Sequence, residues 1–127
     1  MNAREDPFVA HLLDLLAGLG PVVARSMLGG FGLYLDGVMF GLVADETFYL
    51  KTDALSRPRF EAAGLEPFVY EGRNRPVAMS YHEAPSAALD DPDELAGWAR
   101  DAVAAAKRAR AATPSRRPAP RREGAKR

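Results

Sequence analysis

The stretch that decides the fold is residues 25–52, which read RSMLGGFGLYLDGVMFGLVADETFYLKT. Apolar residues alternate with others on both sides of Asp36-Gly37, a pair that favours the positive φ angles of a type I′ turn. Residues 31–42 therefore predict a β-hairpin. A second turn at residues 44–46 is followed by renewed alternation, which predicts a further strand.

Within this hairpin the alternation also predicts which side chains share a face. Val38, Phe40 and Leu42 are two residues apart, and successive side chains of a strand point to opposite faces. We therefore expect all three on the same face of the sheet.

Helical patterns flank these strands. Asp6-Pro7 precedes apolar residues at helical spacing, which predicts an N-cap, a proline in the first turn and an amphipathic helix. Residues 53–63 predict a short helix, and residues 67–82 predict a second hairpin that turns at residues 72–75.

The last predicted helix starts at Asp91-Pro92 and should end before Pro114. Asp91 is the expected N-cap, and Glu94 is the expected acid of a capping box.

The element order is therefore helix, three or four strands, helix, two strands, helix. Its hairpin-length connections require antiparallel pairing, so we expect an α+β two-layer sandwich in which an antiparallel sheet of five to six strands packs against helices. Residues 1–106 should form the domain. Residues 107–127 should hold the end of the last helix and then a disordered tail, because the tail lacks apolar periodicity.

Charge is divided unevenly along the chain. It has 17 basic and 17 acidic residues, but nine of the basic residues and only one acid lie at or after residue 107, which leaves +8 there and −8 before it. Such an arm can bind nucleic-acid phosphates without sequence preference, although a solvated extension explains it as well. The candidate contacts in the tail are Arg108, Arg110, Arg116, Arg117, Arg121 and Arg122.

Several kinds of chemistry are disfavoured by composition. The chain has no cysteine, and its two histidines, His11 and His82, lack neighbours at the spacing of a metal site or a catalytic triad. We therefore expect no catalytic residue, no metal and no cofactor. No signal peptide or apolar span is apparent, so we also expect a cytoplasmic protein without membrane contact.

Two features of the body stand out. Arg25 lies in an apolar strand, where an arginine either pairs with a buried carboxylate or faces a ligand, and pairing is the favoured reading. Gly29, Gly30 and Gly32, with Phe31 among them, resemble a phosphate-binding loop, but a strand follows instead of a helix. We therefore interpret them as a tight turn or bulge.

The run from Arg25 to Ala44 resembles the signature of the TfoX N-terminal-domain family, the bacterial competence-regulator group. The similarity spans about residues 8–108 and departs at Leu28, where the family usually has phenylalanine. It implies a two-layer α/β domain with a regulatory or binding role and no known cofactor. The candidate binding or motif residues are Arg25, Met27, Gly29, Gly30, Gly32, Tyr34 and Lys51.

The sequence thus predicts a non-enzymatic binding or regulatory domain that resembles the N-terminal domain of competence (DNA transformation) regulators. It should act through a protein partner, with nucleic acid as a further partner of the tail. One alternative is a small-ligand-binding or catalytic domain that uses a groove near Arg25 and residues 29–32. Another is an adaptor that forms a homodimer through its sheet.

Overall fold

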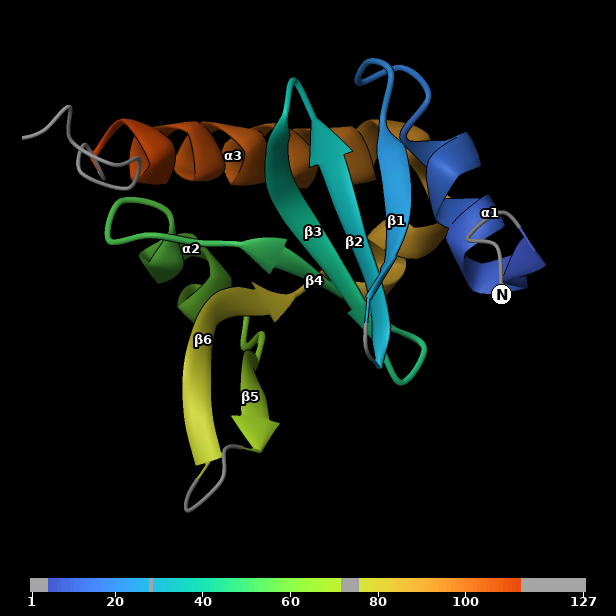
Figure 1. The fold of residues 1–127 in the computed structure, drawn as a ribbon. Helices are drawn as coiled ribbons and strands as arrows, with labels where there is room; N and C mark the ends of the chain where they lie inside the picture. The colour runs from blue at the N-terminus through green and yellow to red at the C-terminus, as the bar shows by residue number, and fades with distance from the viewer. Residues whose placement is uncertain (1–4, 28, 72–75, 113–127) are drawn as a thin grey trace, which may run out of the picture.

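The computed structural model describes residues 5–27, 29–71 and 76–112. These residues form one six-stranded antiparallel sheet, in the order β1-β2-β3-β4-β6-β5, with helices against it (Figure 1). In chain order the elements are α1 (Pro7–Leu15), β1 (Val23–Met27), β2 (Gly30–Leu35), β3 (Val38–Ala44), β4 (Thr47–Lys51), α2 (Arg57–Ala62), β5 (Pro67–Glu71), β6 (Pro76–Glu83), the 3-10 helix η2 (Ser86–Asp90) and α3 (Pro92–Ala111). The predicted α+β fold is confirmed, with four strands before α2.

The helices lie on one face of the sheet. Leu33 and Leu35 of β2 belong to the buried core, so Gly32 and Tyr34, which alternate with them, point to the opposite face. Figure 1 shows α3 crossing behind β2 and β3. We call the side away from the helices the open face.

The core between helix and sheet combines small helix residues with large strand residues. The buried side of α3 is rich in alanine, including Ala99 and Ala102, which lets the helix approach the sheet closely. Phe40 and Phe48 fill the space that remains. Gly41 makes room for the ring of Phe48, because a Cβ at Gly41 would lie 2.7 Å from Phe48 Cε1.

The first hairpin is confirmed, but one predicted side-chain direction is wrong. Asp36 and Gly37 have φ angles of 54° and 80°, as a type I′ turn requires. The β2–β3 register then shifts between Leu33 and Tyr34. Because this bulge adds a residue to β3, Leu42 pairs with Gly32 on the open face and is separated from Phe40.

The predicted helix starts are confirmed at Asp6 and Asp91, whose side chains accept hydrogen bonds from amides of the first turns. The expected capping box is not formed. The carboxylate of Glu94 instead accepts a 3.1 Å hydrogen bond from Trp98 Nε1. The physical reason is that η2 already satisfies the Asp91 amide, which donates to the carbonyl of Ala88.

The end of α3 at Ala111 agrees with the prediction that the last helix stops before Pro114. The expected tail at residues 113–127 lies outside the described residues, as does the turn predicted at residues 72–75. No helix in the described part of the chain has the length and apolar character needed to cross a membrane.

Candidate functional site

The pairing of β1 with β2 brings several candidate residues together on the open face. Arg25 lies opposite Gly32 and Met27 lies opposite Gly30, so Arg25 and Met27 share a face with Tyr34. Lys51 reaches the same face from β4, because it alternates with buried Leu50 and pairs with Tyr81 of β6. The residues on the open face are Val23, Arg25, Met27, Gly32, Tyr34, Met39, Leu42, Tyr49, Lys51 and Tyr81.

Arg25 is exposed and does not have the buried carboxylate partner that we expected. Its guanidinium carbon lies 5.6 Å from the centre of the Tyr34 ring, a cation–π contact. No salt bridge joins it to another described residue. The prediction failed because β1 is an edge strand, and four of its five residues are exposed. The cationic head of Arg25 therefore stays available to a partner.

Lys51 forms a second cation–tyrosine pair on the same face. Its ammonium nitrogen lies 5.3 Å from the centre of the Tyr81 ring and 3.2 Å from Ser80 Oγ. Burial lowers the pKa of Lys51 below its usual value, while nearby Asp53 raises it. Burial, with a smaller effect from Tyr34, raises the pKa of Tyr81 to about 12. Tyr81 is therefore a neutral hydrogen-bonding group at any physiological pH.

Methionines occupy the centre of the open face. A Cβ at Gly32 would lie 2.9 Å from the sulfur of Met27 and 3.1 Å from that of Met39. The glycine thus lets two methionines from flanking strands meet above β2. Unbranched, polarisable methionine side chains adapt to irregular partners. The sequence did not single out Met39, Ser80 or Tyr81 as candidate residues, because the contacts of Lys51 with Ser80 and Tyr81, and the approach of Met39 to Met27, depend on how the strands pair.

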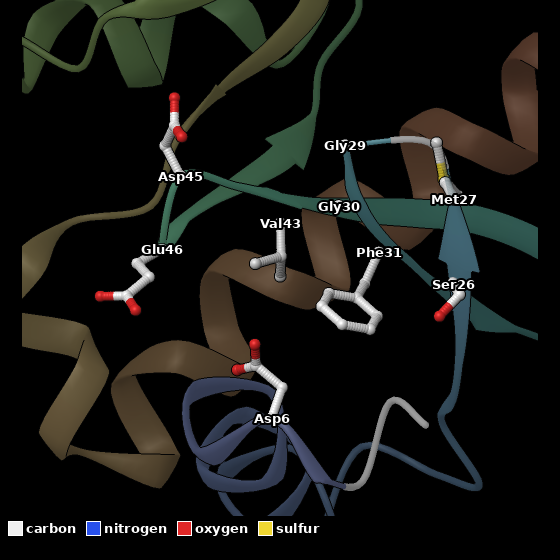
Figure 2. Close-up of a pocket in the computed structure, with 9 residues that line it drawn as sticks. All are labelled: Asp6, Ser26, Met27, Gly29, Gly30, Phe31, Val43, Asp45 and Glu46. Atoms are coloured by element: carbon white, nitrogen blue, oxygen red, sulfur yellow. The ribbon is translucent and has the colours of Figure 1, made fainter. Parts of the chain in front are cut away.

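Gly29 and Gly30 line a hollow of about 400 Å³ at the end of β1 that leads into β2 (Figure 2). Its lining residues are Asp6, Ser26, Met27, Gly29, Gly30, Phe31, Val43, Asp45 and Glu46. Three of these are carboxylates and none is a cation, so the hollow disfavours phosphate. The interpretation of the glycines as a turn is supported, because φ is +84° at Gly29.

The structure does not bring Arg25 to that hollow. Arg25 and Tyr34 line a second hollow of about 390 Å³, together with Pro21, Val23 and the turn residue Asp36. The structure therefore has two separate hollows instead of the single groove expected near Arg25 and residues 29–32. One hollow lies towards each end of β1. In the described part of the chain, no group of three or more histidine, aspartate or glutamate residues is placed to hold a metal ion.

The first basic residues of the predicted nucleic-acid arm already have partners in the body. Lys107 Nζ lies 3.0 Å from an Asp36 carboxylate oxygen. Arg108 donates to both carboxylate oxygens of Asp53, at 2.7 and 3.0 Å. Arg110 donates to the carbonyl of Gly37 at 2.7 Å. The last turns of α3 are thereby attached to the body, which leaves the other four candidates of the tail outside the described residues.

Comparison with known proteins adds the family. Residues 14–106 match the TfoX N-terminal domain. The chain is also 28% identical over 93 residues to DNA transformation protein TfoX1 of Aliivibrio fischeri (strain ATCC 700601 / ES114), an alignment that covers 73% of this chain and 44% of that protein. The chain therefore spans less than half the length of the curated relative that it matches. With the family match extending from the last residues of α1 through most of α3, this chain belongs to the TfoX N-terminal domain family.

Proposed function

We propose that this chain is a non-enzymatic regulatory domain of bacterial DNA transformation, and that it acts by binding another protein through the open face. The regulatory role is suggested by its family and by the relative named as a DNA transformation protein. The observation that supports protein binding is an exposed surface that mixes apolar side chains with Arg25 and Lys51. Val23 and Met27 are 50% and 40% exposed, although large apolar residues normally lie inside.

The contacts of the histidines support a role without catalysis. His82 is buried, its Nδ1 lies 3.2 Å from Thr52 Oγ1, and its ring packs near Phe60 of α2. His11 Nε2 lies 2.7 Å from the carbonyl of Leu89 and so joins α1 to η2. Both side chains therefore hold elements of the fold together, and neither lies on the open face.

The test is a transformation assay in the bacterium that carries the gene. We expect deletion of the gene to change the frequency of DNA uptake, and the wild-type gene to restore it. The double variant Arg25→Ala/Met27→Ala should fail to restore it, because it removes one cation and one apolar group from the open face. Both residues are exposed, so the variant should fold.

The matched control is Leu55→Ala/Arg100→Ala, which removes the same two kinds of side chain elsewhere. Leu55 is 74% exposed just before α2, and Arg100 is exposed on α3. The control should restore transformation fully. If deletion has no effect, the regulatory role is wrong. If both double variants restore transformation, the open face is not the binding surface.

A further inference from the structure

We propose that β1 binds an extended segment of a partner protein as an added edge strand, and that the segment carries the pattern apolar–x–acidic–x–apolar. This inference rests on the proposed function, because it specifies the partner that the open face would recognise. Strand addition at an exposed sheet edge obtains affinity from main-chain hydrogen bonds and specificity from alternate side chains.

The two edges of the sheet differ in a way that favours β1. The β5 edge starts at Pro67, which has no amide hydrogen, and its pairing with β6 shifts register between Pro67 and Val69. Proline and irregular pairing are features that protect an edge from added strands. The strand β1 contains no proline, and its register with β2 continues without a shift from Val23 to Met27.

The side chains of β1 specify the chemistry of the added strand. Val23, Arg25 and Met27 alternate onto the open face, in the order apolar, cationic, apolar. Directly opposed residues on neighbouring strands attract when their charges are opposite and repel when they are alike. The complementary strand therefore presents a carboxylate to Arg25 and apolar groups to Val23 and Met27.

A second copy of β1 does not fit this edge. Antiparallel pairing of two copies over all five residues places Arg25 opposite Arg25, so the like charges repel. The chain's own tail fits no better, because it contains Arg116 and Arg117 and three prolines, at positions 114, 118 and 120. A partner with an acidic strand is the occupant that the charges favour.

The probes are seven-residue peptides of alternating threonine and valine whose central residue is glutamate, lysine or threonine. Each is titrated into the isotope-labelled full chain, and the amide signals of residues 23–27 are followed by NMR together with their hydrogen exchange. We expect the glutamate peptide to bind most tightly and to slow amide exchange in β1. The lysine peptide should bind roughly tenfold more weakly, because one attractive pair becomes a repulsive one.

Charge reversal supplies the matched variants. Arg25→Glu should reverse the preference, so that the lysine peptide binds more tightly than the glutamate peptide. Arg100→Glu makes the same change in net charge at an exposed site on α3 and should leave the preference as it is in the wild type. Equal effects of the two variants would mean that net charge alone governs binding, which would overturn the proposal.

Backbone methylation distinguishes strand addition from loose docking. An added strand directs alternate amide groups towards β1, so N-methylation of one alternate set in the glutamate peptide should abolish binding and methylation of the other set should not. Strand addition is wrong if methylation of neither set abolishes binding, or if methylation of each of the two sets abolishes it. It is also wrong if the unmethylated glutamate peptide does not bind. Dimers of the peptide-free chain that pair through β1 would also overturn it. These peptide measurements do not depend on DNA transformation. A negative result would therefore contradict strand addition without contradicting the regulatory role.

Discussion

At the scale of single residues, two adjacent glycines, Gly29 before β2 and Gly30 at its start, are required for different reasons. Gly29 has a φ of +84°, a backbone conformation that costs a side chain about 1–2 kcal/mol, and nothing lies within 4 Å of a Cβ placed there. Gly30 has no such φ, but a Cβ there would lie 2.0 Å from the carbonyl oxygen of Val43. The first glycine is needed for conformation and the second for close approach of two strands.

Substitutions at these glycines should separate the two causes. Gly29→Ala should lower the free energy of unfolding by about 1 kcal/mol, and Gly30→Ala should lower it by about 2 kcal/mol or more, because the backbone of β3 must move. Urea denaturation measures both. Asparagine tolerates positive φ, so Gly29→Asn should recover part of the loss while Gly30→Asn should not. A Gly30→Ala variant as stable as the wild type would contradict the predicted clash.

At the scale of elements, His82 connects β6 to α2. The side chain is 4% exposed, its ring centre lies 5.8 Å from that of Phe60, and Phe60 in turn contacts Trp98 of α3. Burial lowers the pKa of His82 below its usual value. Smaller effects come from Glu61 and Glu66, which raise the pKa, and from Arg57, which lowers it. The fold therefore prefers the neutral imidazole.

This preference makes stability depend on pH. Since the folded-state pKa is below that of the unfolded chain, about 6.5, the contribution of His82 is fully present above pH 6.5. It decreases as the pH falls from there towards the folded-state pKa, because the unfolded chain then binds the extra proton. The urea midpoint of the wild type should fall from pH 7 to pH 5.

The variant His82→Gln provides the comparison for this prediction. Its side chain does not titrate, so its urea midpoint should change less over the same pH range. The two proteins differ only at residue 82, so the comparison isolates the effect of this side chain. An equal acid response in the variant and the wild type would show that His82 does not cause it.

At the scale of the whole molecule, the first cations of the basic segment contact the body of the chain. The segment starts at Lys107 and contains the end of α3 at Ala111, as the sequence predicts for the last helix. Lys107, Arg108 and Arg110 contact Asp36, Asp53 and the Gly37 carbonyl. These three cations therefore contribute to attaching α3 to the sheet, and the other six basic residues of the segment lie beyond residue 112.

Nucleic-acid binding should accordingly depend on the residues after Ala112. Six basic residues follow it. If about five phosphates are neutralised, the affinity of the full chain for duplex DNA should fall with salt at a log–log slope of about −4.5. A chain that ends at Ala112 should lose this binding and keep its stability, whereas Lys107→Ala should keep the binding. Equal binding by the full and shortened chains, measured by fluorescence anisotropy over a salt series, would exclude the tail as a nucleic-acid arm.

By itself the sequence determined the elements and their pairing type. Asp6 and Asp91 marked helix starts, and Asp36-Gly37 marked the hairpin, because capping and turn preferences depend on a few adjacent residues. The family signature likewise identified Arg25, Met27, Gly32, Tyr34 and Lys51 as candidate binding residues, without placing them together.

Only the tertiary structure decided where these side chains lie. The bulge between β2 and β3 moved Leu42 to the open face, and the pairing of β4 with β6 placed Tyr81 beside Lys51. Strand order made β1 an edge, which left Arg25 exposed instead of paired in the core. Such facts depend on contacts between residues distant in the chain, and local propensity does not encode the register that forms those contacts.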